Sequence, residues 1–324
     1  MTTFDGRGLL TLLRAVGAGA AATEIRATLE HPDLVAAAVG LGLTPEDLLQ
    51  GFTHDLDSPV PNATVRPIAA YCGELLRHRS EIESLAEVLE HSGPGMVRES
   101  LVRTTRWLPT GVEPGEIRLV LVPLGFDFRT DRGTVYLDPL SALEYGTEGI
   151  RDTLSHELHH VARYRLTGEE LTLMRPDAVS VPDDLAGTLR EWASWLEAEG
   201  IADCVWSMTQ LETTALREAA RVRRDQEERF GSILRGVFDG LRSHPADADR
   251  SALPELRANL RQLAHPVGHA MAMTIERELG HDTLIGCVGR PRRFVEEYNH
   301  AASRTSRVRF EVDRFGWDGP MRAG

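Results

Sequence analysis

A five-residue segment near the middle of the chain, His156-Glu157-Leu158-His159-His160, has the pattern HExxH. On an α-helix, residues four apart lie on nearly the same face, so the imidazoles of His156 and His160 can bind one cation. Catalytic zinc sites use such imidazoles, with three protein ligands and a water in the fourth position. Glu157 would lie beside that water and could accept its proton as general base. This pentad therefore predicts zinc-dependent hydrolysis, with one Zn²⁺ per chain.

The pentad needs a helix to hold it, and the surrounding sequence predicts one from Glu148 to Arg165. This stretch contains no proline and ends shortly before Gly168, a residue typical of helix ends. Its apolar residues recur on the side opposite to the two histidines, so one face can pack while the other presents imidazoles. They are Ile150, Leu154, Leu158 and Val161. The alternative is an exposed polar helix face in a metal-free protein.

A third ligand is predicted in the stretch from Trp195 to Asp203. Glu199 is the candidate ligand, because Asp203 shares its helix face and could accept a proton from a ligand histidine. Glu197 is the rival ligand, although its side chain points about 160° away from that of Glu199. Gly200 is expected to let this helix approach the pentad helix closely. The alternative for Glu199 is a surface carboxylate on an acidic helix.

The combination of HExxH with Glu199-x-x-x-Asp203 some tens of residues later resembles the gluzincin metallopeptidases, which are thermolysin-like enzymes in the broad sense. The segment Glu199-Gly200-Ile201-Ala202 narrows the resemblance to poorly characterised bacterial families described as zinc-dependent proteases. The resemblance extends over about residues 115–300. It implies a peptidase core with a small β-sheet before the pentad helix, surrounded by helices, and a peptide or protein as substrate.

Two further histidines, His265 and His269, precede an apolar helix. In families of this kind the same place usually has a Tyr-x-x-Gly-x-x-Met pattern, in which His265 takes the position of the tyrosine. Either histidine could donate a hydrogen bond to the oxyanion that forms when a carbonyl is attacked. Each could equally be a structural histidine, so the oxyanion donor stays open.

Two residues near the predicted ligands have competing interpretations. His159 could be an alternate ligand, but we expect it to face solvent or to lie beside the ligands. Arg163 projects from the same helix face as His156 and His160. It could bind a substrate carboxylate or an acidic residue close to the metal, and an ordinary surface arginine is the alternative.

The remaining sequence predicts a mainly α protein (α+β) in three parts. Residues 1–110 form a helical N-terminal scaffold, in which residues 92–95 make a turn. Residues 111–305 form the metallopeptidase-like domain, with strands at 117–124 and 133–138, a loop at 125–132 and helices between 211 and 242. Residues 133–138 are the candidate edge strand for binding an extended peptide, or part of a plain hairpin. Residues 306–324 are a tail with a short strand at 308–312.

Composition limits the classes of function. The chain has 324 residues, 42% of them hydrophobic, and a formal net charge of −13, which disfavours nucleic acid as a partner. No apolar run is long enough to span a membrane. Three widely spaced cysteines and the absence of a signal-peptide pattern predict a cytoplasmic protein. The second class of function that stays open is a metal-binding or catalytically inactive helical protein acting through partner contacts, and the oligomeric state is not fixed by the sequence.

Overall fold

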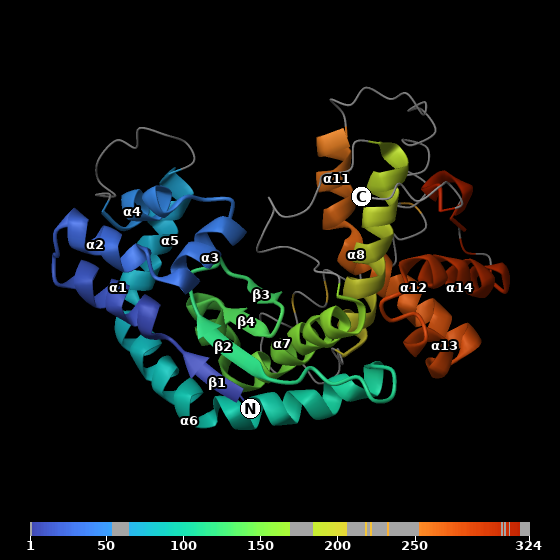
Figure 1. The fold of residues 1–324 in the computed structure, drawn as a ribbon, viewed down its shortest axis with the longest axis horizontal. Coiled ribbons are helices and arrows are strands. Elements are labelled where there is room, and N and C mark those ends of the chain that lie inside the picture. The colour runs from blue at the N-terminus through green and yellow to red at the C-terminus, as the bar shows by residue number, and fades with distance from the viewer. Residues whose placement is uncertain are drawn as a thin grey trace. The chain divides into compact units, whose positions relative to one another are not determined.

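The protein is described here by a computed structural model, which covers residues 2–53, 65–168, 184–205, 253–305 and 312–317 and the single residues 218, 221, 232, 307, 309 and 310. It is mainly helical with one small mixed β-sheet, as the sequence predicts (Figure 1). The described chain forms two compact units, each with its own hydrophobic core. The first unit contains residues 2–53, 65–102 and 114–161. The second contains residues 103–113, 162–168 and the described residues from 184 onward.

The sheet belongs to the first unit and has the strand order β1-β2-β4-β3. Its strands are β1 (Thr2–Asp5), β2 (Ile117–Leu121), β3 (Phe128–Asp131) and β4 (Thr134–Leu137). The pairs β1–β2 and β2–β4 are parallel, whereas β3 pairs with β4 in the antiparallel direction. The central strand β2 is buried at every position except Arg118, which is half-buried, as expected for a strand covered on both faces.

The sequence-based assignment of residues 133–138 as an edge strand is wrong. β4 lies inside the sheet between β2 and β3, and the edge is β3, which falls within the segment predicted to be a loop. Only Phe128 of β3 is buried, and the other three residues are partly exposed. An edge strand of this kind has polar residues, which is why its sequence resembles a loop. The other edge strand, β1, was not predicted at all.

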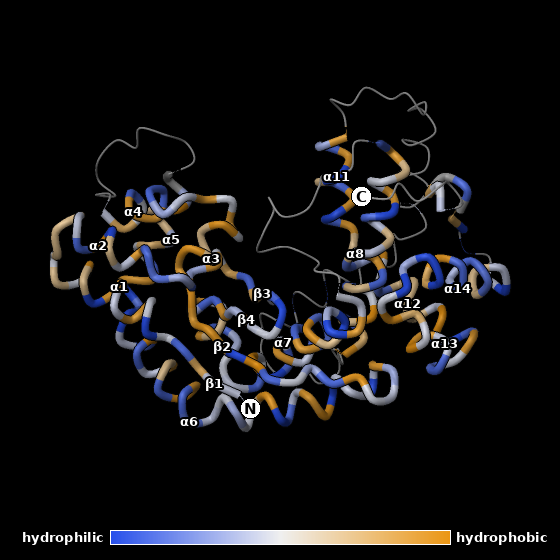
Figure 2. The backbone as a smooth tube through the Cα atoms, viewed as in Figure 1, coloured by the Kyte–Doolittle hydropathy of each residue, from blue (hydrophilic) through white to orange (hydrophobic). Residues whose placement is uncertain are grey.

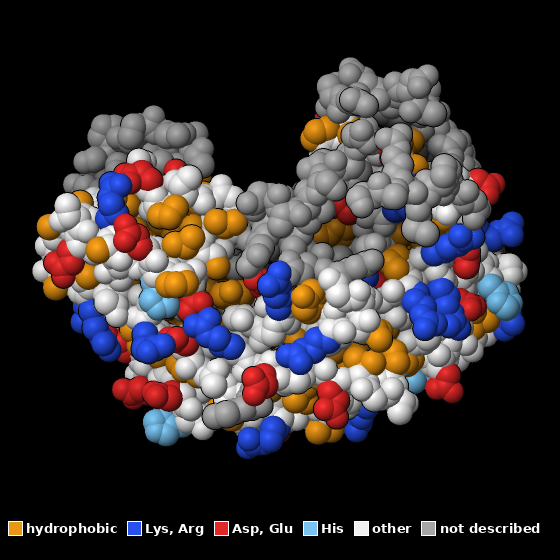
Figure 3. Space-filling model, in the orientation of Figure 1, with side chains coloured by type: hydrophobic (Ala, Val, Ile, Leu, Met, Phe, Trp, Pro, Cys, Tyr) orange, Lys and Arg blue, Asp and Glu red, His pale blue; other side chains and the backbone are white. Residues whose placement is uncertain are grey.

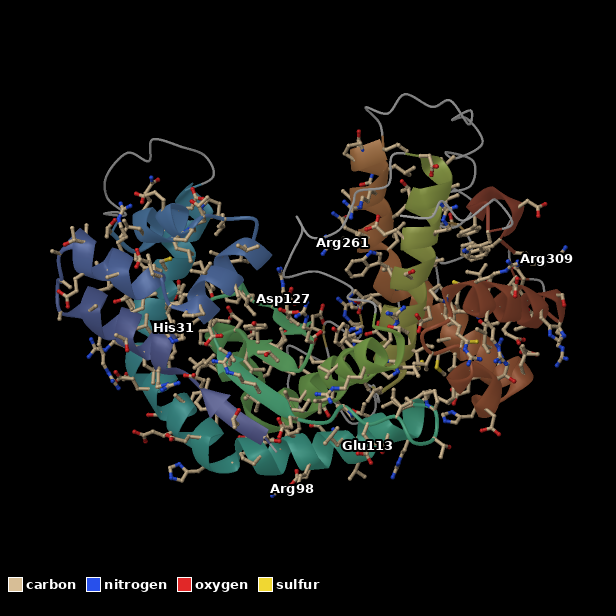
Figure 4. All side chains as sticks on the ribbon, viewed as in Figure 1. His31, Arg98, Glu113, Asp127, Arg261 and Arg309 are labelled. Atoms are coloured by element: carbon tan, nitrogen blue, oxygen red, sulfur yellow. The ribbon has the colours of Figure 1, made fainter. Side chains whose placement is uncertain are left out.

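Six helices of the first unit share a hydrophobic core with this sheet (Figure 1). They are α1 (Arg7–Gly17), α2 (Ala22–Leu29), α3 (Pro32–Gly40), α4 (Pro45–Thr53), α5 (Val65–Arg77) and α6 (Arg79–Thr104), the last two residues of α6 belonging to the second unit. Arg118 of β2 forms ion pairs with Asp5 of β1 and Asp33 of α3. Asp33 also lies next to His31, which is labelled in Figure 4. The N-terminal helices are therefore joined to the sheet by charge as well as by apolar packing.

Helix α6 runs through the segment predicted as a turn at residues 92–95, and Pro94 lies inside it. A proline inside a helix removes one backbone hydrogen bond and costs about 3 kcal/mol. The helix continues because apolar residues on both sides of the proline are buried, among them Leu89 before it and Met96 and Val97 after it. Figure 2 shows hydrophobic and hydrophilic residues alternating along α6, as expected for a helix with one buried face.

The pentad lies on α7 (Pro139–Thr167), which begins earlier and ends later than the predicted Glu148 to Arg165. The extra N-terminal segment, residues 139–145, joins the rest of the helix through a kink at Gly146, whose φ of 63° is accessible to glycine at little cost. The predicted back face is confirmed, since all four of its residues are buried. They are Ile150, Leu154, Leu158 and Val161.

The described part of the second unit consists of helices that share one hydrophobic core with α8 (Leu185–Val205). The others are η1 (Thr105–Trp107), α11 (Leu253–Gln262), α12 (Ala264–Leu279), α13 (His281–Ile285), α14 (Pro291–Ser303) and η2 (Val312–Phe315). Trp192, Met271 and Phe294 lie in its core. Arg261 of α11, labelled in Figure 4, lies 4.8 Å from the centre of the Trp195 ring on α8, a cation–π contact.

Parts of the predicted C-terminal region can be compared with this unit. The described residues of the predicted strand at 308–312 do not form one, and Val312 begins η2 instead. The predicted helices between 211 and 242 lie outside the described residues apart from positions 218, 221 and 232. The division at residues 110 and 305 stays a prediction. None of the described helices is both long and apolar enough to cross a bilayer.

Candidate metal centre

The two outer histidines of the pentad converge on one point beside α7. The Nε2 atoms of His156 and His160 lie 3.0 Å apart, and their rings meet edge to face at an interplanar angle of 80°. Two nitrogens bound to a tetrahedral zinc ion at its usual bond length would lie about 3.3 Å apart. The spacing in this structure is within a few tenths of an ångström of that value. The pair therefore fits two of the ligand positions of a zinc ion.

The pentad is buried, which argues against the alternative of an exposed polar face. His156 is 5% exposed and Glu157 is 6% exposed, while His160 is half-buried. Burial of an ionisable group is costly unless it is paired or binds a cation. The expectation that His159 faces solvent is wrong, because its side chain is fully buried and its ring centre lies 6.4 Å from that of His160. The other expectation, that His159 lies beside the ligands, stays a prediction, with a role as an alternate ligand as the second possibility.

The start of α7 is fixed by a polar network that the sequence did not reveal. Asp138 caps the helix, because its Oδ1 accepts hydrogen bonds from the backbone N–H groups of Leu140 and Ser141, each at 3.0 Å. Its Oδ2 accepts hydrogen bonds from the backbone N–H of Leu124 and from the hydroxyl of Tyr71. Burial raises the pKa of both Asp138 and Tyr71. The network ties α5, the segment after β2 and the pentad helix together.

The predicted third ligand belongs to a cluster of carboxylates on α8 in the second unit. Glu197, Glu199 and Asp203 are at most 4% exposed, so none is a surface carboxylate. The imidazole of His265 on α12 lies between two of them. Its Nδ1 is 3.2 Å from Asp203 Oδ2, and its Nε2 is 3.5 Å from Glu199 Oε2. Glu199 and Asp203 thus share a helix face, as the sequence predicts, and His265 contacts both.

Glu197, the rival ligand, has other partners. Its Oε2 accepts a hydrogen bond from Arg163 Nε at 2.8 Å and lies 2.7 Å from Arg163 Nη2. Its Oε1 accepts a hydrogen bond from the backbone N–H of Gly289 at 2.8 Å. With both oxygens engaged, Glu197 is the less suitable of the two carboxylates for a metal. Arg163 is 1% exposed, so the surface-arginine interpretation is wrong, and its partner is an acidic residue next to the candidate ligand.

The position of His265 depends on a close crossing of α8 and α12. A Cβ atom on Gly200 would lie 2.4 Å from backbone atoms of Gly268, and a Cβ on Gly268 would lie 2.3 Å from the carbonyl oxygen of Leu196. The helices therefore touch backbone to backbone, about one turn after His265. Gly200 thus permits a close approach to α12. The close approach to the pentad helix that the sequence predicts for this glycine stays a prediction.

The second candidate oxyanion donor, His269, lies one turn after His265 on α12. It is 8% exposed, whereas the side chain of His265 is 43% exposed. A substrate could therefore reach His265 more readily than His269. The catalytic role of either histidine stays a prediction.

Within each unit the residue types are those of a zinc peptidase: a helical histidine pair with a neighbouring glutamate in one, and a buried carboxylate with an aspartate and a histidine in the other. A family model described as “Putative zinc dependent peptidase (DUF5700)” matches residues 53–306. This match covers most of the chain, including the pentad, Glu199 and His265, and the chain belongs to that family. No curated protein and no solved structure gives a significant match.

Proposed function

We propose that this protein is a zinc-dependent peptidase of gluzincin type, in which His156, His160 and Glu199 bind one zinc ion. The observation that carries the proposal is the 3.0 Å separation of the two Nε2 atoms on successive turns of α7. Membership of a family described as zinc-dependent peptidases supports it. The engagement of Glu197 with Arg163 and Gly289 also supports it, because Glu199 is then the carboxylate better suited to a metal.

The proposed chemistry needs an activated water. Bound zinc lowers the pKa of its water toward about 7 and polarises a substrate carbonyl. Glu157 follows His156 directly in the chain and is almost fully buried. Its carboxylate takes a proton from the attacking water and returns it to the amine nitrogen as the C–N bond breaks. Glu157 is therefore the general base and then the general acid.

His265 is the proposed oxyanion donor, in preference to His269. Its contact with Asp203 fixes the orientation of the imidazole ring, which is how carboxylates orient histidines at metal sites. Its side chain is partly exposed, so a substrate oxygen can reach it. Asp203 thus acts as a positioning residue.

The substrate class follows from the family, and we propose a peptide or protein. On the face of the molecule drawn in Figure 3, acidic and arginine side chains are interspersed over the surface. With the net charge of −13, this supports the expectation that nucleic acid is not a partner. The cytoplasmic location expected from the sequence is likewise a proposal.

Metal content tests the proposed function directly. Protein purified without added metal is analysed for zinc by elemental analysis, as wild type, Glu199→Ala and the control Glu191→Ala. We expect about one zinc per chain in the wild type and the control, and much less in Glu199→Ala. Glu191 lies on the same helix but forms an ion pair with Arg257, so it controls for general effects on α8.

Two results would contradict the proposal. Wild-type protein without zinc that also fails to take up added zinc would leave the second class, a metal-free helical protein acting through partner contacts. Full zinc content in Glu199→Ala would remove Glu199 from the ligand set. A peptide-library assay of the zinc-loaded wild type then tests hydrolysis itself.

A further inference from the structure

The most deeply buried ion pair described in the second unit joins Arg163 of α7 to Glu197 of α8. The two side chains are 1% and 0% exposed, and the guanidinium lies within 2.7 to 2.8 Å of Glu197 Oε2 through two nitrogens. Burying such a pair costs so much desolvation free energy that apolar replacements are often neutral or stabilising. The pair is therefore not explained by stability, and a geometric role must be considered.

The turn before α14 also contacts this ion pair. The other oxygen of Glu197 accepts a hydrogen bond from the backbone N–H of Gly289, in the turn before α14. Gly289 has a φ of 70°, and a Cβ atom there would lie 2.4 Å from Thr167 Cγ2 in the last turn of α7. A side chain at this position would therefore push against the end of α7. Glycine permits both the turn and the contact with Thr167.

The sequence positions of this pair connect it to the proposed ligands. Arg163 lies three residues after His160 on α7, and Glu197 lies two residues before Glu199 on α8. Because each helix is stiff over one turn, shifting the Arg163–Glu197 contact would also shift the ligands carried by the two helices. Zinc binding tolerates displacements of only a few tenths of an ångström in its ligands.

We propose that Arg163, Glu197 and the Gly289 amide form a brace that positions the pentad helix and α8 for zinc binding. The brace residues are positioning residues and do not contact the metal or the substrate. This inference rests on the proposed function, because it assumes that the two helices supply ligands to one ion. It assigns a role to Arg163, to Glu197 and to the Gly289 turn, none of which the proposed chemistry uses.

The test measures zinc affinity by competition with a chelating indicator, together with the free energy of unfolding of the metal-free protein. The main variant is Arg163→Met/Glu197→Leu, which replaces the pair by apolar side chains of similar size. We expect it to fold, with a stability lowered only by the loss of the acceptor for the Gly289 N–H, and to bind zinc about tenfold or more weakly than wild type, as for other residues that orient ligands. Arg163→Lys, which keeps the charge but not the guanidinium fork, should give an intermediate affinity.

The matched control is Glu191→Gln. Glu191 lies on α8, two turns before Glu199, and forms a two-point ion pair with Arg257 of α11. We expect the zinc affinity of Glu191→Gln to lie within about twofold of wild type, because the loss of the Glu191–Arg257 ion pair leaves the brace intact. Should the double variant fail to fold, Glu197→Gln is compared with Glu191→Gln, and a lower zinc affinity in the former alone is the expected result.

Zinc affinity within about twofold of wild type in a folded double variant, or equal affinities in Glu197→Gln and Glu191→Gln, would overturn the brace and leave the proposed function standing. A wild-type protein that binds no zinc would overturn the proposed function, and the brace with it. The two failures are therefore distinguished by the wild-type measurement.

Discussion

Gly200 of α8 and Gly268 of α12 touch backbone to backbone, with 2.4 Å between an ideal Cβ on Gly200 and the carbonyl group of Gly268. A contact under 3.0 Å is not found for real Cβ atoms, so any side chain at either position forces the helices apart. The crossing brings His265 of α12 against Glu199 and Asp203 of α8. Two glycines therefore decide whether the carboxylates of α8 meet their histidine.

Gly200→Ala is expected to destabilise the protein. Overpacking against backbone atoms costs about 1 to 3 kcal/mol, and the separation of the helices should also weaken zinc binding. The control is Gly95→Ala in α6, where the nearest atom to a Cβ is 3.8 Å away and alanine should be neutral or stabilising. Urea unfolding of both variants measures the difference. An unchanged stability in Gly200→Ala would show that the helices separate without cost.

Glu157→Gln is expected to keep its zinc and lose peptidase activity. Glutamine has nearly the shape of glutamate but cannot take a proton from the attacking water. His156→Ala should lose both zinc and activity, since it removes a proposed ligand. Zinc content and the rate of peptide cleavage are measured on the same preparations. Retained zinc in His156→Ala would remove this histidine from the ligand set, and retained activity in Glu157→Gln would remove the general base.

Asp138→Ala is expected to lower the free energy of unfolding by about 3 kcal/mol. The substitution removes the cap of α7 and leaves the hydroxyl of Tyr71 without its buried acceptor, while the backbone N–H of Leu124 keeps only its longer hydrogen bond to the Tyr71 oxygen. Tyr71→Phe, which removes only the hydroxyl, should cost about 1 kcal/mol. Urea unfolding of the two single variants and the double variant gives the coupling energy. Independent, additive effects would mean that the network does not act as a unit.

Asp5 gives the stability a defined dependence on pH. The Arg7 guanidinium hydrogen-bonded to Asp5 holds the pKa of that carboxyl well below its ordinary value of 3.8. The stabilisation by the ionised Asp5 is therefore fully present above pH 3.8 and is lost as the pH falls below it. Asp5→Asn should cost about 1 kcal/mol at pH 7, because its partner Arg7 is largely exposed.

The difference in the free energy of unfolding between wild type and Asp5→Asn should shrink as the pH is lowered below 3.8. Urea unfolding from about one unit below to about three units above that value measures it. Glu90→Gln, an exposed change on α6, is the control for the loss of one negative charge. A difference that grows on acidification would contradict the assignment.

Two of the three cysteines are expected to be unreactive in the folded protein. Burial raises the pKa of the thiols of Cys72 and Cys287 to about 12 in each case. Since their ordinary value is 9.0, the reactive thiolate at pH 8 is about a thousandfold scarcer than in the unfolded chain. A chromogenic disulfide reagent should label all three cysteines rapidly in denaturant. Rapid labelling of more than one in the native protein would contradict the prediction.

The sequence by itself determined the features that depend on local spacing. The i, i+4 separation of His156 and His160 and the apolar residues behind them were enough to predict the pentad helix with its buried back face. The helical class of the protein followed in the same way. Residues 92–95 show where such reasoning fails, because burial of the residues around Pro94 overrides its local preference.

Strand order was decided only by tertiary structure. β1 at the N-terminus pairs with Ile117–Leu121, more than a hundred residues away. Its four residues are too few to show the alternation of apolar and polar side chains that predicts a strand. β3 is an edge strand because β2 pairs with β4, which leaves β3 on the outer side of β4. Pairing between distant segments has no local signature, since any extended segment offers the same backbone groups.

The choice between Glu197 and Glu199 shows the same division at the candidate site. Two glutamates on one helix have the same chemistry, and spacing favoured Glu199, which shares a helix face with Asp203, with Glu197 as the rival. In the folded protein Glu197 accepts hydrogen bonds from Arg163 and from the Gly289 backbone N–H, whereas Glu199 lies beside His265. These partners come from other helices. Residue types and local spacing thus defined what the ligands could be, and the packing of distant elements decided which carboxylate is bound to an arginine and which lies beside a histidine.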